Sequence, residues 1–292
     1  MGRLAGAARR RPAHRGRGAR ARGSGGLTVR RAAALGPCRQ AALLGLAQGV
    51  AEVVPVSSSA QLVLLPWLLG WEPPGDRTTF AAGLHAGSCL GITWVLRHDL
   101  RSLDRRTTGL LAGSCLPAAV AGALAADRVE ARLGRPPQLA ALLAGAGVLL
   151  WRADHRAEQS PRAGIGAREA TVAAFAQIAA LAPGVSRSGA TLTALRAVGV
   201  ERAAAQRFSL LMSLPVTAGA AALTLVRCDR ATLRALAPPL ATGAGCAALA
   251  GAVAARAQQL RPGRSATFPA LYRLGLAAVV VRRLRTTRKD LQ

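Results

Sequence analysis

The sequence predicts an all-α polytopic membrane protein, organised as an inverted repeat of about six transmembrane helices and two re-entrant helix hairpins. The first reason is composition: 51% of the 292 residues are hydrophobic, but only 3% are aromatic. The second is arrangement, because long Ala/Leu/Gly/Val runs alternate with short arginine-rich stretches. Small apolar residues let helices approach closely in lipid, whereas a soluble core of this size would normally contain more aromatic side chains.

Six apolar segments are long enough, with generous boundaries, to cross a bilayer core of about 30 Å. The third of them is the shortest. Charged linkers rich in arginine separate the segments, as expected for loops that face water and lipid headgroups. The six segments are Thr79–Leu96, Gly109–Ala126, Gln138–Trp151, Phe208–Val226, Ala235–Ala255 and Ala266–Val281.

Two further apolar regions are interrupted near the middle by proline and a cluster of serines. They are Gln40–Trp71 and Ala170–Val200, and each arm is only about 12 to 16 residues long, too short to span the core. Irregular polar backbone at membrane depth is tolerated only inside protein or beside a water-filled cavity. Both regions are therefore predicted to be re-entrant helix–loop–helix hairpins.

The two hairpins resemble each other in sequence, and each is followed by three predicted spans. An odd number of spans places the second half upside down relative to the first, which gives an inverted repeat of residues 36–152 and 168–282. Together they form one membrane domain over residues 36–285. Residues 1–35 contain ten arginines and no acid, which predicts a basic disordered tail or sequence upstream of the true start.

The net charge of +26 comes almost entirely from arginine, since Lys289 is the single lysine. A nucleic-acid partner is not expected, because few aromatic side chains are available to stack bases and the arginines lie between apolar segments. The five cysteines are scattered and form no Cys-x-x-Cys pair. This pattern indicates neither a disulfide framework nor a zinc site.

The first hairpin carries Gln48 and Glu52, four residues apart and therefore on one face of a helix. An acid inside an apolar run is a candidate functional residue by default; the alternative is a headgroup position or a structural ion pair. The following serines, Ser57, Ser58 and Ser59, open the second arm. Serines at a helix start cap free N–H groups, and this end of a helix attracts anions.

The second hairpin adds Ser186, Arg187, Ser188 and Thr191 within the run Pro183-Gly-Val-Ser-Arg-Ser-Gly-Ala-Thr191. Arginine presents a planar fork of donors that matches phosphate. The sequence therefore predicts a phosphate site where the two hairpins meet. A structural ion pair between Arg187 and Glu52 is the alternative.

These stretches resemble a known family. The run Gly45-Leu-Ala-Gln-Gly-Val-Ala-Glu-Val-Val-Pro-Val-Ser-Ser-Ser59, the run from Pro183 to Thr191, and Arg207-Phe-Ser-Leu-Leu-Met-Ser-Leu-Pro215 are similar to the undecaprenyl-diphosphate phosphatases, or bacitracin-resistance proteins. Phe268-Pro-Ala-Leu-Tyr-Arg273 fits the remaining pattern, and the resemblance runs from about Ala41 to Val281. It implies hydrolysis of undecaprenyl diphosphate to the monophosphate, which recycles the lipid carrier for cell-wall synthesis.

The resemblance also implies roles for individual residues. Gln48 and Glu52 match the motif linked to a divalent cation, Mg²⁺ or Ca²⁺, and Glu52 also to catalysis. Ser58 matches the proposed nucleophile or phosphate-positioning serine. Arg187 matches the phosphate clamp that acts in catalysis. The remaining expected phosphate-binding residues are Ser57, Gln61, Ser186, Ser188 and Thr191.

One position departs from the family pattern, since Gln61 stands where the pattern has histidine. An amide hydrogen-bonds to phosphate but cannot act as a general acid or base. If the family histidine moves a proton, restoring it here would raise turnover. His85, in the first predicted span, is the one histidine at membrane depth that could replace it, the alternative being a packing role.

The rival interpretation is a transporter or flippase of polyprenyl phosphate, because inverted repeats with broken helices are typical of transporters. The expected partners are a polyprenyl diphosphate, membrane lipids and, as an alternative to a monomer, a second copy of the chain. The resemblance implies a multi-pass protein of the bacterial plasma membrane whose site faces outward.

Overall fold

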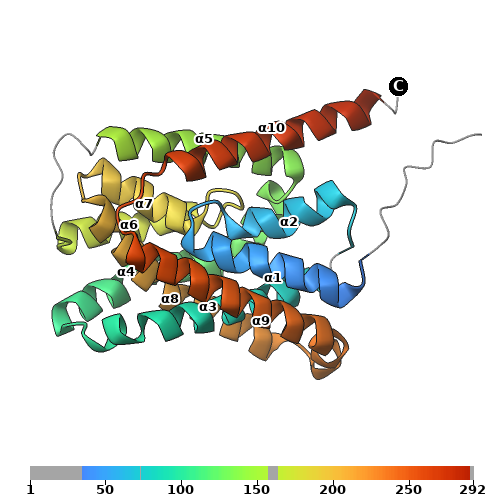
Figure 1. Ribbon diagram of the computed structural model, residues 1–292, viewed down its shortest axis with the longest axis horizontal. Helices are drawn as coiled ribbons and strands as arrows, with labels where there is room; N and C mark the ends of the chain where they lie inside the picture. Colours follow the sequence, from blue (N-terminus) through green and yellow to red (C-terminus); the bar gives the residue numbers. More distant parts are fainter. Residues whose placement is uncertain (1–34, 73, 157–163, 290–292) are drawn as a thin grey trace, which may run out of the picture. The chain divides into compact units, whose positions relative to one another are not determined.

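The computed structural model describes residues 35–72, 74–156 and 164–289, and these residues form ten α-helices and no β-sheet (Figure 1). The predicted basic tail lies, apart from its last residue, outside the described residues. The first half of the chain contains α1 (Pro37–Val53), α2 (Ser58–Leu69), α3 (Arg77–Arg101), α4 (Arg105–Leu133) and α5 (Pro136–Arg156). The second half contains α6 (Ala167–Ala179), α7 (Arg187–Ala197), α8 (Arg202–Arg227), α9 (Arg230–Leu260) and α10 (Thr267–Lys289).

Four helices, α3, α4, α8 and α9, are long and apolar enough to cross a membrane. The other two predicted spans are also single helices, because α5 has 21 residues and α10 has 23. At a rise of 1.5 Å per residue, these lengths match a core of about 30 Å. The predicted all-α, polytopic membrane protein is confirmed.

Both predicted hairpins are present as two short helices joined by a tight break. Residues 54–57 separate α1 from α2, and residues 180–186 separate α6 from α7. Three of the long helices begin at an aspartate whose carboxylate accepts a hydrogen bond from the backbone N–H three residues later: Asp76, Asp104 and Asp229. Hydrogen bonds from Thr107 and Thr232 hold the pKa of Asp104 and Asp229 below the usual range. These caps therefore stay charged at neutral pH and complement the helix dipoles.

The two halves interlock. The first helix of each hairpin packs on the fourth helix of the other half, so α1 lies on α9 and α6 lies on α4. The pairs α3–α8 and α5–α10 join equivalent helices of the two halves, and α5 and α10 run side by side in Figure 1. This reciprocal packing is what a two-fold repeat predicts.

The helices pack much more closely around α9 than around α4. Around α9, a Cβ added to Gly49 of α1 or Gly91 of α3 would overlap the backbone carbonyl of Ala247 or Ala248 of α9. By contrast, α4 leaves its leucines Leu116 and Leu124 largely exposed. Close backbone contact through small residues thus fixes α1 and α3 on α9, and α4 faces lipid.

The two ends of the bundle also differ. At the end where α5 stops and α8 begins, the buried carboxylate of Asp154 accepts hydrogen bonds from Arg196 at 2.9 Å, from Arg202 at 2.8 Å and from the backbone N–H of Ala266 at 2.9 Å. This cluster joins α5, α7, α8 and the start of α10. The cluster therefore ties these elements together at this end of the bundle.

Candidate active site

Both hairpin breaks end in a serine with a positive φ angle. Ser57 and Ser186 directly precede α2 and α7, and they are the two non-glycine residues with positive φ in the described part of the chain, at 71° and 70°. The Oγ atoms of Ser57 and Ser59 lie 3.3 Å apart, and those of Ser186 and Ser188 lie 3.2 Å apart. A left-handed serine costs on the order of 1–3 kcal/mol, and such strain concentrates at functional sites.

Arg187 follows Ser186 and is in the same relative position as Ser58 in the first hairpin. Its Nη2 pairs with the carboxylate of Glu52, which lies on α1. Its Nη1 donates to the carbonyl oxygen of Ser213 at 2.7 Å and to the hydroxyl of Thr217. The predicted alternative of an Arg187–Glu52 ion pair is thus present, and α8 holds the guanidinium from the other side.

Glu52 is buried, with 4% of its surface exposed, and both of its oxygens are engaged. Oε1 accepts from Arg187 and, at 3.2 Å, from Thr217. Oε2 accepts from Gln48 Nε2 at 2.7 Å and lies 3.0 Å from Nδ1 of His85. The carboxylate therefore connects the first hairpin, α3, α8 and the second hairpin at one point.

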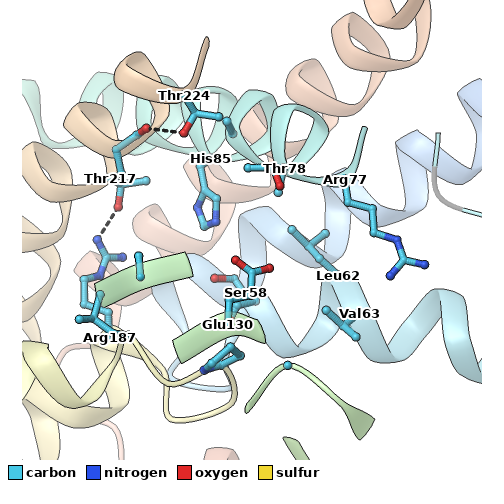
Figure 2. Close-up of a pocket in the computed structure, with 18 of the residues that line it drawn as sticks. Ser58, Leu62, Val63, Arg77, Thr78, His85, Glu130, Arg187, Thr217 and Thr224 are labelled. Atoms are coloured by element: carbon cyan, nitrogen blue, oxygen red, sulfur yellow. Dashed lines mark hydrogen bonds between the residues drawn. The ribbon is translucent and has the colours of Figure 1, made fainter. Parts of the chain in front are cut away.

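A cavity of about 560 Å³ lies over this cluster. Its polar wall carries Glu52, Ser58, His85 and Arg187, and Figure 2 shows Ser58, His85 and Arg187 arranged around it. Its apolar lining comes from several elements, among them α2 with Leu62 and Val63, α3 with Phe80, the second hairpin break with Leu181 and α8 with Val216. The start of α3 and the ends of α4 and α8 supply the exposed lining residues Arg77, Thr78 and Glu130 together with Thr224, which is partly exposed. The cavity therefore combines a charged floor with an apolar wall.

The structure brings some of the predicted site residues to the cavity and places others behind it. Glu52, Ser58, Ser186 and Arg187 line the cavity. The five others do not line it: Gln48, Ser57, Gln61, Ser188 and Thr191.

Thr191 lies behind the second hairpin break and supports it. Its hydroxyl donates to the carbonyl of Arg187 at 3.0 Å and lies 2.6 Å from the hydroxyl of Ser209 on α8. The threonine thus ties the first turn of α7 to α8. This contact fixes the backbone from which the guanidinium of Arg187 projects.

Gln61 is buried on the far side of the first hairpin from the cavity. Its Nε2 donates to the carbonyl oxygen of Val56 at 3.3 Å, and its Oε1 accepts from the hydroxyl of Tyr272 on α10 at 3.0 Å. His85, by contrast, reaches the cavity and contacts Glu52. The histidine that this chain presents to the cavity is thus the one on α3, and the position of the family histidine is used for packing between helices.

A divalent cation would find few protein ligands here. Within the described residues, no group of three or more His, Cys, Asp and Glu side chains could hold a metal ion. Gln48 Oε1, however, is a buried oxygen without a hydrogen-bond partner among these residues, and it belongs to the amide that contacts Glu52. Mg²⁺ is commonly held by only one or two carboxylates together with substrate phosphates and water. Glu52 and Gln48 could supply such a small set of protein ligands.

Several residues of the site were not anticipated from the sequence. Thr217, whose hydroxyl holds Arg187, is an ordinary polar residue in an apolar helix and gave no signal. Ser213 lies in the family-like run from Arg207 to Pro215, but it holds Arg187 through its backbone carbonyl, which a side-chain pattern does not reveal. Arg273 did carry a signal, because an arginine inside a predicted span is a candidate functional residue by default. It is fully buried and contacts both hairpin breaks.

Comparison with known proteins agrees with this geometry. The family model described as bacitracin resistance protein BacA matches residues 41–279. The chain belongs to the BacA family. Relatives named undecaprenyl-diphosphatase include one from Geobacter metallireducens, 40% identical over 200 residues, which are 63% of this chain and 74% of the relative. Another, from Moorella thermoacetica, is 36% identical over 256 residues, which are 83% of this chain and 96% of the relative.

Proposed function

We propose that this member of the BacA family hydrolyses a polyprenyl diphosphate, undecaprenyl diphosphate in the first place, to the monophosphate and inorganic phosphate. The observation that carries the proposal is the meeting of the two hairpins, where Arg187 and Ser58 face one cavity beside the buried carboxylate of Glu52. The names of the relatives add the substrate. The charged floor suits a diphosphate, and the apolar lining of the cavity suits a prenyl chain.

In the resting site, Arg187 is paired with Glu52. A terminal phosphate offers the guanidinium a more highly charged partner with matching bidentate geometry, so the substrate competes for Arg187. The N-terminal ends of α2 and α7 add their free N–H groups and helix dipoles at the same place. Together these groups stabilise the charge that develops on the transferring phosphoryl group.

Release of Arg187 leaves Glu52 free to accept a proton. A nucleophilic oxygen, from Ser58 or from water, forms a bond to the terminal phosphorus and gives its proton to Glu52. The phosphoanhydride bond breaks, and the bridging oxygen leaves with the polyprenyl monophosphate. If Ser58 is the nucleophile, water then hydrolyses the phosphoserine and restores the hydroxyl.

Glu52 has an alternative role in the proposal. It would hold a divalent cation, Mg²⁺ or Ca²⁺, together with the free oxygen of Gln48, and the nucleophile would then give its proton to water. When bound, the cation would neutralise charge on the diphosphate oxygens. A cation and Arg187 would compete for the carboxylate of Glu52. Because the diphosphate binds the guanidinium of Arg187 and draws it away from Glu52, binding of the diphosphate would strengthen binding of the cation, and the reverse.

The proposed setting is the bacterial plasma membrane, with the open end of the cavity facing outward, and the proposed role is recycling of the lipid carrier and resistance to bacitracin. Purified protein in detergent, given undecaprenyl diphosphate with and without Mg²⁺, should release inorganic phosphate in a cation-dependent way. If the protein in vesicles moved polyprenyl phosphate across the vesicle membrane but released no inorganic phosphate, a transporter would be supported instead.

A further inference from the structure

Among the described residues, Arg273 on α10 is the most deeply buried charged residue that the proposed reaction does not use. Its exposed fraction is 0%, and within the described residues no carboxylate pairs with it. An arginine buried without an acid is strongly unfavourable unless its donors are used. Its position therefore needs a functional or structural reason.

The donors of Arg273 reach both hairpin breaks. Nε donates to the carbonyl oxygen of Pro55 at 2.7 Å, and Nη1 donates to the carbonyl oxygen of Val185 at 3.2 Å. Pro55 lies two residues before Ser57, and Val185 lies directly before Ser186. One rigid guanidinium thus holds the two backbone segments that lead into the left-handed serines.

The third donor group, Nη2, is packed against backbone and is not hydrogen-bonded within the described residues. It lies against Gly189, where an added Cβ would overlap it and would come within 3.0 Å of Cζ. Gly189 belongs to the first turn of α7, directly beside the residues that face the cavity. The absence of a side chain at this glycine makes room for the guanidinium.

Neighbouring contacts support the same arrangement. Tyr272, the residue before Arg273, donates to Gln61, and Gln61 in turn donates to the carbonyl of Val56. On the opposite face, an added Cβ at Gly147 of α5 would lie 3.2 Å from Cβ of Arg273. The start of α10 is therefore wedged between α5 and the two breaks.

We infer that Arg273 is a positioning residue, which fixes the two hairpin breaks relative to each other and so aligns Ser58 with Arg187. This inference rests on the proposed function for its effect on catalysis, but the clamp itself is a property of the fold. A planar fork holds two carbonyls at a set separation, whereas an ammonium cannot reproduce this geometry. A small misplacement of reacting groups costs about 10²-fold in rate.

The kinetic test compares Arg273→Met and Arg273→Lys with the unaltered protein, using undecaprenyl diphosphate and the full chain in detergent. We expect kcat to fall about 10²-fold in Arg273→Met and about 10-fold in Arg273→Lys, with KM within about threefold in both, because alignment affects the transition state more than binding. Gly275→Ala is the matched control on α10, since nothing lies within 4 Å of its added Cβ. A folded Arg273→Met protein with kcat within threefold of the unaltered protein would overturn the inference.

Gly189→Ala perturbs the same contact from the other side and leaves the charge in place. We expect it to lower kcat about 10-fold, because the new methyl group displaces the guanidinium. In the Arg273→Met background the methyl group has nothing to displace, so the double variant should match Arg273→Met alone. Losses that multiply in the double variant would mean that the two residues act separately, and the clamp would be refuted.

Amide hydrogen exchange tests the clamp without relying on activity. In Arg273→Met, residues 54–61 and 183–190 should both exchange faster, while the α3–α9 contact keeps its protection. If the unaltered protein released no phosphate but the two breaks still loosened together, the proposed function would fail and the clamp would stand. Unchanged exchange in both breaks would overturn the clamp whatever the activity.

Discussion

The guanidinium of Arg187 and the carboxylate of Glu52 form an ion pair although the two residues are 135 positions apart in the chain. Each lies on a different hairpin, so the pair exists only because the two halves interlock. A buried pair of this kind is weak evidence for stability, since desolvation offsets most of the attraction. In the proposed function, an incoming phosphate would replace the carboxylate as partner of the guanidinium, which would give both charges a role.

Replacing Arg187 tests the phosphate clamp directly. In Arg187→Ala, we expect phosphate release to fall by at least about 10³-fold, because a charge-assisted bidentate contact to the transferring group is lost. Arg187→Lys should recover little of this loss. The control is Arg207→Ala, whose side chain is 59% exposed and pairs with Asp99 at the surface. Near-native turnover of a folded Arg187→Ala protein would exclude the clamp.

Glu52 and Gln48 test the proposed cation. Chelation of divalent cations should lower phosphate release by the unaltered protein, and added Mg²⁺ should restore it. Glu52→Gln should abolish both the activity and the response to Mg²⁺, because an amide is a poor ligand for a hard cation. Titration of phosphate release against Mg²⁺ measures both effects.

The variant Gln48→Glu adds a carboxylate to the proposed cation site, whereas Glu52→Gln removes one. If a cation binds there, the added carboxylate should lower the Mg²⁺ concentration needed for half-maximal activity, and maximal activity should be kept. If no cation binds, the new carboxylate faces Glu52 at the present 2.7 Å contact and loses a donor. Repulsion between the two acids would then lower activity at every Mg²⁺ concentration.

The sequence was sufficient to predict the two broken hairpins, because proline and serine clusters interrupt apolar runs that are otherwise regular. It also predicted that Glu52 and Arg187 belong to one site, since both are charges at membrane depth. It could not assign Gln61 to the back of the first hairpin, because the side of a short helix that faces a cavity depends on packing against α10. Contacts across 211 and 218 residues, from Gln61 to Tyr272 and from Pro55 to Arg273, have no local pattern.

Asp154 provides a prediction about stability rather than catalysis. Its carboxylate is 2% exposed and is the shared acceptor of Arg196 and Arg202. Asp154→Ala would leave Arg196 buried without an acid, and breaking such a pair costs about 3–5 kcal/mol. We expect a clearly lower Tm in detergent, whereas Asp99→Ala, which removes a partly exposed partner of Arg207, should change Tm little. An unchanged Tm in Asp154→Ala would show that the cluster does not hold this end of the bundle.

Variants at Gln61 and His85 test which of the two positions matters for the rate of phosphate release. Gln61 lies behind the first hairpin, so we expect Gln61→His to leave kcat within a few-fold of the unaltered value. His85 reaches the cavity and lies 3.0 Å from Glu52 Oε2, so His85→Gln should lower kcat by about 10²-fold, the usual size of a lost proton-transfer or orienting contact. The decisive measurement is the double variant Gln61→His/His85→Gln. Because the imidazole at position 85 reaches the cavity and a side chain at position 61 does not, we expect histidine at position 61 not to restore the activity lost at position 85. A substantial rescue would show instead that side chains at both positions reach the reacting phosphate.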